Sequence, residues 1–222
     1  MRGDEGSGRI SIHTIALNSN MPYRGKRSLD LVLATITLVA LSPIILCTFV
    51  VVRIVHGKPA IFRQTRPGKN EISFELLKFR SMTNERTQDG VLLDDKGRLT
   101  ALGRFIRSTS IDELPSLVNV LKGEMSIVGP RPLMKEYLSR YTPWQRRRHL
   151  VKPGITGLAQ VSGRNNLRWR ERFEYDVLYV DSASIKLDVV ILLKTLWIVL
   201  LRKGISANGE ATMYEFTGDQ EP

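Results

Sequence analysis

A long apolar run covers residues 31–52, where 22 consecutive positions carry no charged side chain. A bilayer core requires about 20 apolar residues in helical form, so this run is a candidate membrane segment. A cleaved signal peptide fits less well, because the run is too long and no small-residue cleavage site follows it. We therefore expect a membrane-associated helical unit over residues 21–58, preceded by a flexible tail over residues 1–20, which is rich in Gly, Ser and Asn.

Ser42 and Pro43 interrupt the middle of this run. A proline removes one backbone hydrogen bond of a helix and disfavours helical geometry at the preceding residue. Basic side chains flank the run on both sides, namely Arg24, Lys26, Arg27, Arg53 and Lys58. A single span would place one basic cluster on the wrong side of the membrane, whereas a re-entrant hairpin broken at Ser42-Pro43 keeps both in the cytoplasm. An ordinary span with a mild proline kink remains the alternative.

The remaining residues, 59–222, have the pattern of a small cytoplasmic domain. Residues 60–64 and 72–77 are expected to be short strands around a Gly/Pro turn, and the polar stretch 84–98 a surface loop with some helix. Helices are expected over residues 114–121, 133–148 and 169–180. The pattern therefore predicts an α+β fold that is mainly helical.

Residues 187–201 are unusually apolar for a surface helix. They include Asp188 and Lys194, and the segment is short for a membrane span. One interpretation is an amphipathic helix lying in the membrane interface, with Trp197 at the headgroups. The other is a buried core helix, and the pattern leaves both open.

The charge balance narrows the class of partner. The chain has 33 Lys and Arg against 22 Asp and Glu, a formal net charge of +11. Such an excess favours anionic partners: nucleic acid, phosphorylated metabolites or an anionic membrane surface. Cys47 is the only cysteine, so an internal disulfide is excluded, and its apolar surroundings do not favour a catalytic thiolate.

Residues 110–115, which read SIDELP, hold two adjacent carboxylates. Ser-x-x-Glu is the capping-box pattern of a helix start, and Pro115 requires that start to fall near residues 110–112. Asp112 and Glu113 would then lie at the positive end of the helix, where a phosphate or an ionised carboxylate is favoured. Neighbouring helical side chains diverge by about 100°, so one acid can attack phosphorus while the other holds Mg²⁺ or a partner group. The spacing alone favours a helix-capping role for this acidic pair over a catalytic role.

Arginines on Gly/Pro turns surround this motif in the sequence. Arg131 stands between two prolines, Arg164 follows a glycine, and Arg107 lies just upstream of the acids. The planar guanidinium donates two parallel hydrogen bonds to phosphate. Taken singly, each is more simply a solvated arginine on a turn. Together with a membrane segment, they favour a diphosphate substrate at the bilayer surface.

Seven motifs occur in an order that resembles a known family. They are residues 26–30 (KRSLD), 42–43 (SP), 78–82 (KFRSM), 110–114 (SIDEL), 129–132 (GPRP), 153–157 (PGITG) and 162–165 (SGRN). Over about residues 24–218 the chain resembles bacterial sugar transferases, the monotopic polyprenyl-phosphate phosphoglycosyl transferases. With its single membrane segment, it is similar to the minimal catalytic form of that family.

The resemblance implies an activity. Family members move a sugar 1-phosphate from a UDP-sugar to undecaprenyl phosphate and release UMP, with the catalytic domain on the cytoplasmic face of the bacterial inner membrane. The family nucleophile, an Asp that attacks the β-phosphorus to form a covalent phosphosugar enzyme, matches Asp112. Glu113 matches its partner, and both acids would hold the Mg²⁺ cofactor. The break at Ser42-Pro43 matches the family's re-entrant helix.

Further positions follow from the same resemblance. Those expected to contact substrate or phosphate are Lys78, Arg107, Arg131, Arg164, Asp176 and Asp188. The tail over residues 209–218 is similar to members that initiate protein glycosylation with a diacetamido-trideoxyhexose such as that of UDP-diacetylbacillosamine. Inner-membrane lipid is an expected partner, nucleic acid is not, and a homodimer is compatible with the sequence. A membrane-anchored basic module that binds lipid or nucleic acid without catalysis is the rival hypothesis.

Overall fold

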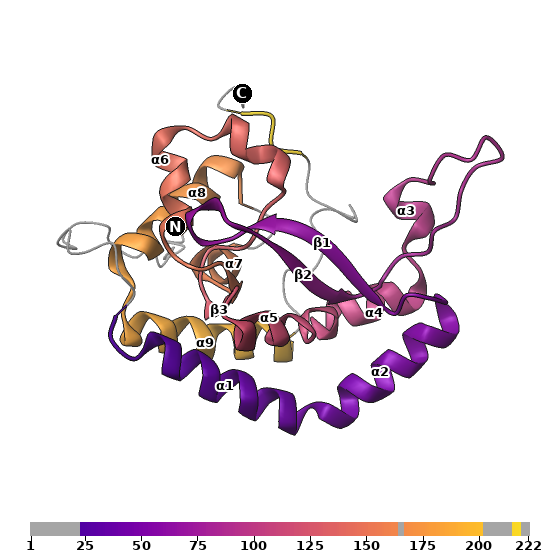
Figure 1. Cartoon of the computed structure of the whole chain (residues 1–222), viewed down its shortest axis with the longest axis horizontal. Coiled ribbons are helices and arrows are strands. Elements are labelled where there is room, and N and C mark those ends of the chain that lie inside the picture. Colours follow the sequence, from indigo (N-terminus) through magenta and orange to yellow (C-terminus); the bar gives the residue numbers. More distant parts are fainter. Residues whose placement is uncertain (1–22, 164–166, 202–214, 219–222) are drawn as a thin grey trace, which may run out of the picture.

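The computed structural model describes residues 23–163, 167–201 and 215–218 and confirms a mainly helical α+β chain (Figure 1). The first half contains α1 (Lys26–Ala40), α2 (Ser42–Val55), β1 (Ile61–Pro67), the 3₁₀ helix η1 (Lys69–Glu71), β2 (Ser73–Phe79), α3 (Asp95–Arg98) and α4 (Ala101–Ser108). The second half contains η2 (Ile111–Glu113), α5 (Ser116–Lys122), β3 (Ser126–Val128), η3 (Lys135–Arg140), α6 (Pro143–Arg146), η4 (Arg147–Leu150), β4 (Gly154–Thr156), α7 (Leu158–Ser162), α8 (Trp169–Ser182) and α9 (Ile185–Leu201).

The apolar run forms two helices, α1 and α2, with a bend of 64° between their axes. Pro43 has no N–H to donate to the carbonyl of Val39, and the Ser42 hydroxyl donates to that carbonyl instead, at 2.8 Å. Pro43 itself lies in the first turn of α2, where its missing N–H is tolerated. Among the described residues no single helix has the length and apolarity to cross a bilayer, and α1 and α2 meet both criteria only when taken together across the bend.

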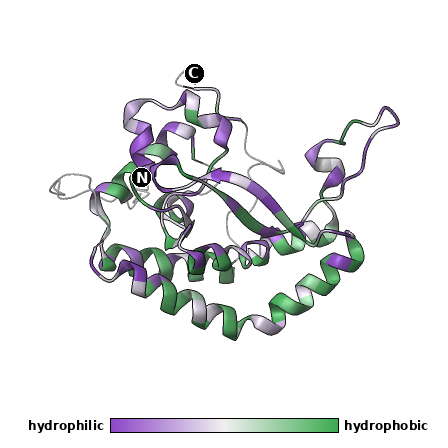
Figure 2. Ribbon diagram, viewed as in Figure 1, coloured by the Kyte–Doolittle hydropathy of each residue, from purple (hydrophilic) through white to green (hydrophobic). Residues whose placement is uncertain are grey.

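Three helices present exposed apolar side chains, and Figure 2 shows α1, α2 and α9 as the most hydrophobic part of the ribbon. Ile36 on α1 and Leu46 on α2 are 60% and 65% exposed, and Trp197 on α9 is 63% exposed. In α9 only Asp188 and Ile191 are buried. The alternative of a buried core helix over residues 187–201 is therefore wrong, because its apolar side chains face outward.

The predicted strand pair is confirmed as the antiparallel hairpin β1–β2. Helix α5 packs across β2 through two polar side chains. The Ser116 hydroxyl donates to the carbonyl of Leu77 at 2.7 Å, and the side-chain oxygen of Asn119 accepts from the N–H of Leu77 at 3.1 Å. The N–H and the carbonyl of Leu77, the residue before Lys78, are thus both hydrogen-bonded to side chains of α5.

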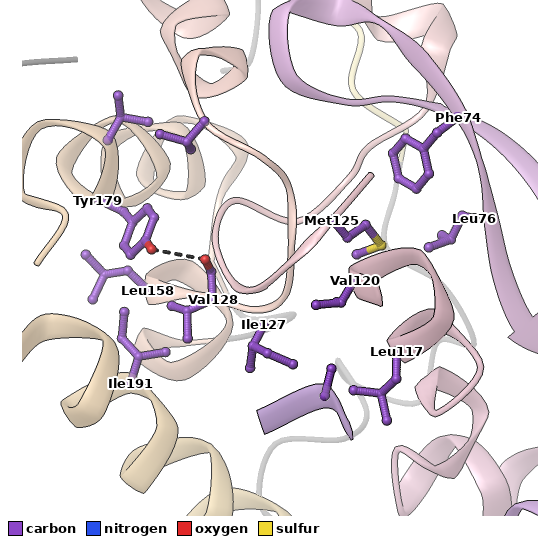
Figure 3. Packing of buried hydrophobic residues seen from close by; sticks show 13 residues of the cluster. Phe74, Leu76, Leu117, Val120, Met125, Ile127, Val128, Leu158, Tyr179 and Ile191 are labelled. Carbon is purple, nitrogen blue, oxygen red and sulfur yellow. Dashed lines mark hydrogen bonds between the residues drawn. The ribbon is translucent and has the colours of Figure 1, made fainter. Parts of the chain in front are cut away.

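A second sheet, β3–β4, is parallel and has only two strands. Its backbones approach so closely that a Cβ on Gly154 would lie 2.1 Å from the backbone nitrogen of Gly129, which requires glycine there. Apolar side chains of α5, β3, α8 and α9 pack around it, as Figure 3 shows. In this core the Tyr179 hydroxyl donates to the Val128 carbonyl at 3.0 Å.

The helix predicted over residues 133–148 is wrong as one element. The segment is divided into η3, α6 and η4. Pro143 starts α6 at a position where proline is favoured, and Thr142 and Gln145 form a reciprocal capping box there. The proline and its cap thus begin a new helix instead of continuing the previous one. The helices predicted over 114–121 and 169–180 are confirmed as α5 and α8, and some helix in 84–98 as α3.

Candidate active site

The two adjacent carboxylates lie on the short 3₁₀ helix η2, not on the first turn of an α-helix. Ser110 has a left-handed backbone, with φ of 58°, and its side chain makes no capping hydrogen bond. The α-helix expected to start at residues 110–112 starts at Ser116. The capping-box prediction is therefore wrong. The physical reason is that the Glu113 carboxylate bonds to cationic side chains, and such charge-assisted bonds are stronger than a bond to a neutral backbone N–H.

Glu113 is held by two cations that reach it from different segments. Lys78 of β2 donates to Oε1 at 2.7 Å, and Arg131, in the segment after β3, donates to the same oxygen at 2.8 Å. Burial opposes ionisation of Glu113, but the charges of Arg131 and Lys78 outweigh it and lower its pKa to about 2. Glu113 is therefore an ionised anchor in a fixed orientation.

Asp112 differs sharply from its neighbour. Within the described ranges, no side chain donates a hydrogen bond to its carboxylate. Burial, and next the negative charge of Glu113, raise the pKa of Asp112 to about 6, although Lys78, Arg131 and Arg107 act in the opposite direction. Near neutral pH this carboxylate is ionised, and no described residue donates to its lone pairs. Such a group is suited to attack an electrophile or bind a cation.

Arg107 and Arg131 complete the positive surroundings of the pair. Arg107 of α4 donates from Nε to the Ser81 hydroxyl at 2.9 Å. Burial lowers the pKa of Arg107, while the charge of Asp112 raises it, so the two side chains interact electrostatically. The structure thus brings together four sequence-predicted groups around Asp112: Glu113, Lys78, Arg107 and Arg131.

Asp176 acts on this cluster only through other residues. Its Oδ2 accepts from Arg148 at 2.7 Å, and Arg148 in turn donates to the backbone carbonyl of Arg131 at 2.6 Å. Both side chains of this ion pair are almost fully buried. Asp176 thus orients the segment that carries Arg131, and the structure shows no direct contact between Asp176 and Glu113.

Asp188 belongs to a different buried network. It accepts from Lys26 at 2.6 Å, from Tyr23 at 2.8 Å and from Tyr179 at 2.8 Å. These contacts join the start of α1 to α8 and α9, and none of them involves Asp112 or Glu113. Arg164 and residues 209–214 of the tail lie outside the described residues.

Three residues that support the site were not predicted from the sequence: Ser116, Asn119 and Arg148. The sequence did contain a signal for Ser116 and Asn119, because they are polar positions among the apolar residues of a short helix. Both are buried and bonded to β2. Arg148 was predicted only as the last residue of a helix over residues 133–148, and no local feature of three consecutive arginines distinguishes the buried one.

The donor set fits a magnesium ion only in part, through the two acids. The described residues contain no cluster of three or more His, Cys, Asp or Glu side chains that could enclose a metal. Magnesium, however, is usually bound by one or two carboxylates together with substrate phosphates and water. In the part of the chain that the structure describes, Asp112 has no hydrogen-bond donor, and the hydrogen bonds from Lys78 and Arg131 to Glu113 both fall on Oε1. One oxygen of each acid is thus compatible with such a site.

An uncommitted carboxylate, its anchored neighbour and three cations define an enzyme site suited to an anionic substrate, next to helices with exposed apolar faces. A sequence model described as bacterial sugar transferase matches residues 21–202. The chain therefore belongs to the bacterial sugar transferase family and is an enzyme.

Curated relatives agree with this assignment. The chain is 53% identical over 193 residues to the uncharacterized sugar transferase EpsL of Bacillus subtilis, covering 87% of this chain and 96% of that protein. It is 41% identical over 187 residues to the UDP-glucose:undecaprenyl-phosphate glucose-1-phosphate transferase of Klebsiella pneumoniae, covering 78% and 39%. It is 40% identical over 197 residues to the undecaprenyl-phosphate galactose phosphotransferase of Salmonella typhimurium, covering 81% and 41%. The chain thus spans less than half the length of the last two relatives.

Proposed function

We propose that this enzyme transfers a sugar 1-phosphate from a UDP-sugar to undecaprenyl phosphate and releases UMP. The names of the Klebsiella and Salmonella relatives support this reaction class. The observation that carries it is the contrast between the two adjacent acids: Glu113 is held by Lys78 and Arg131, whereas no donor among the described residues engages Asp112. A site that only bound anions would gain nothing from an ionisable carboxylate kept free of partners in its centre.

The proposed chemistry has two displacements at one phosphorus atom. First, a carboxylate oxygen of Asp112 attacks the β-phosphorus of the UDP-sugar. The bond from that phosphorus to the bridging oxygen breaks, and UMP leaves with the electron pair. A phosphate oxygen of undecaprenyl phosphate then attacks the same phosphorus and displaces the Asp112 carboxylate. The product is a polyprenyl diphosphate sugar, and the carboxylate is regenerated.

The surrounding residues supply orientation and charge. Arg107 and Arg131 are positioned to pair with phosphate oxygens, because a guanidinium matches their geometry. Lys78 and Arg131 fix Glu113 at 2.7 and 2.8 Å, so that the second acid does not compete as nucleophile. Magnesium bound by Asp112 and Glu113 would neutralise charge on the diphosphate.

A direct assay tests the reaction. Purified full-length enzyme is incubated with Mg²⁺, undecaprenyl phosphate and each member of a UDP-sugar panel, and UMP is measured. We expect UMP release with at least one sugar and its loss in Asp112→Asn. As a matched control, Asp89→Asn removes an exposed loop carboxylate and should leave release unchanged. Failure to release UMP with any sugar, while the lipid acceptor is active with another transferase, would refute the proposal.

The identity of the sugar is a separate part of the proposal. The names of the curated relatives include glucose, galactose and N-acetylgalactosamine as transferred sugars. We propose that an N-acetylated amino or deoxy sugar, such as that of UDP-diacetylbacillosamine, is the substrate here. The support is the resemblance of residues 209–218. Preference for UDP-glucose or UDP-galactose in the panel would contradict it.

We further propose that α1 and α2 form a re-entrant hairpin in the bacterial inner membrane, with the catalytic domain on the cytoplasmic face. The 64° bend and the basic residues at both ends of the helix pair support this topology. Cysteines are introduced separately at Arg24 and Lys58 after replacement of Cys47 by Ser. A membrane-impermeant thiol reagent should label both from the cytoplasmic side. Labelling from opposite sides would show a span.

A further inference from the structure

A cavity of about 200 Å³ lies at the N-terminal end of α1, away from the carboxylate pair. Its walls come from the start of α1, from β3, from Lys69 of η1, from the residues just before β4 and from Tyr179 of α8. Figure 3 shows Tyr179 and Val128, two of its lining residues, joined by their hydrogen bond. None of Asp112, Glu113 or Lys78 lines this cavity, so it is distinct from the site described above.

Four cationic side chains line the cavity: Lys26, which pairs with Asp30 and Asp188, and Arg27, Lys69 and Lys152. The guanidinium of Arg27 and the ammonium of Lys152 converge, because atoms of both lie 3.4 and 3.5 Å from the position of a Cβ built on Gly123. Arg27 is oriented by hydrogen bonds to the carbonyls at the end of α5, at 2.6 and 2.9 Å. Within the described residues, neither Lys69 nor Lys152 has an acidic partner.

Asp30, the acid of the cavity, is engaged by other groups and, among the described residues, forms no ion pair with Arg27, Lys69 or Lys152. Asp30 accepts from the Ser126 hydroxyl and from the N–H of Ile127, both at 3.0 Å, and pairs with Lys26 at 3.3 Å. Burial, followed by the charge of Arg27, lowers the pKa of Lys152; the charge of Asp30 opposes this shift, and the charge of Lys69 adds to it. Like charges are therefore crowded in a partly enclosed space, an arrangement that an external anion would stabilise.

The position of the cavity indicates where that anion comes from. Lys26 and Arg27 begin α1, and Ala183 precedes α9. The two apolar helices α1 and α9 therefore both start at the cavity (Figure 1). Val32 on α1 and Ile185 on α9 are 54% and 56% exposed. If these apolar faces contact the acyl region, the cavity lies at the level of the headgroups.

We propose that this cavity binds the headgroup phosphate of an anionic phospholipid through Arg27, Lys69 and Lys152. Basic pockets beside membrane helices are known to hold anionic headgroups in this way. The cations have N–H groups left to donate, and the phosphate oxygens are strong acceptors. The bound lipid would orient the start of α1 against the bilayer surface. The proposal does not rest on the transferase reaction.

The test measures binding of defined lipids to the full-length protein in a neutral detergent, without UDP-sugar or undecaprenyl phosphate. The probes are short-chain phosphatidylglycerol, short-chain phosphatidylcholine and inorganic phosphate, and native mass spectrometry gives the fraction bound. We expect phosphatidylglycerol to bind in preference to the other two. The double variant Lys69→Gln with Lys152→Gln should weaken this binding at least about tenfold.

A matched control removes the same total charge elsewhere. Arg63→Gln with Lys135→Gln changes two exposed cations that do not line the cavity, and its affinity should stay within about twofold of wild type. Equal weakening in both double variants would indicate general charge attraction and overturn the proposal. Unchanged binding in the cavity variant, or inorganic phosphate binding as tightly as phosphatidylglycerol, would also overturn it. The single variants Lys69→Gln and Lys152→Gln provide the same comparison if the double variant does not fold.

Discussion

Neutralising each of the two adjacent acids should change stability in opposite directions. Asp112→Asn removes a carboxylate whose ionisation is disfavoured by burial and by Glu113, so this variant should be more stable than wild type at pH 7. Glu113→Gln removes a carboxylate that is paired with Lys78 and Arg131 and leaves both cations without their partner, so it should be less stable. Both substitutions preserve the shape of the side chain.

The magnitudes follow from the pKa of each acid. The pKa of Asp112 rises from 3.8 to about 6 on folding, and at 1.36 kcal/mol per unit the ionised group costs at most about 3 kcal/mol. That cost is absent below about pH 4 and complete above about pH 6, so the gain of Asp112→Asn should appear as the pH rises through this window. The pKa of Glu113 falls from 4.5 to about 2, so its contribution, also about 3 kcal/mol, is fully present above about pH 4.5 and is lost as the pH falls toward 2.

The assay is denaturant unfolding of the three proteins in one detergent, at several values between pH 4 and pH 8, with a chelator present so that no divalent cation offsets the charge of Asp112. We expect the curves of wild type and Asp112→Asn to converge at pH 4 and separate by pH 7, and Glu113→Gln to be the least stable throughout pH 5–8. If Asp112→Asn were as destabilising as Glu113→Gln at pH 7, the assignment of different electrostatic roles to the two acids would be refuted.

Three further substitutions test the support of the site and of the apolar helices. Asp188→Asn leaves the buried ammonium of Lys26 without its main charge partner and should lower stability by about 3 kcal/mol in denaturant unfolding; a loss below 1 kcal/mol would contradict this. Gly103→Ala places a Cβ 1.8 Å from the carbonyl oxygen of Ser81 and should cost at least about 2 kcal/mol, and an unchanged melting temperature would contradict that close approach. Asp176→Asn should reduce UMP release without moving Asp112 and Glu113 on η2, because Asp176 acts through Arg148 on the backbone of Arg131. A variant with full activity would show that the orientation of Arg131 by this ion pair is not needed.

The parts of the fold that the sequence predicted have strong local signals. The hairpin β1–β2 is marked by a Gly/Pro turn, and the break between α1 and α2 by Pro43. The predicted helix over residues 133–148 failed where Pro143 begins a new element with its own cap. The parallel pair β3–β4 was not predicted, because two strands of three residues have no readable period and their pairing joins segments far apart in the chain.

The predicted active site shows the same division. Motif resemblance identified Asp112, Glu113, Lys78 and the nearby arginines, and the structure brings Lys78 and Arg131 onto Glu113. It could not separate direct from indirect roles. Asp176 and Asp188 were expected near the substrate, yet both are buried in ion pairs with other segments. Such assignments depend on which distant side chain fills the adjacent space, and a single sequence does not contain that information.

The central claim, that Asp112 is the nucleophile, is tested most directly by intact mass spectrometry of the enzyme after incubation with its UDP-sugar and Mg²⁺ in the absence of undecaprenyl phosphate. The account predicts an added mass of one sugar phosphate, located at Asp112 by fragmentation, absent in Asp112→Asn and removed when undecaprenyl phosphate is supplied. UMP release without such an adduct under conditions that preserve acyl phosphates, or an adduct that persists in Asp112→Asn, would contradict it.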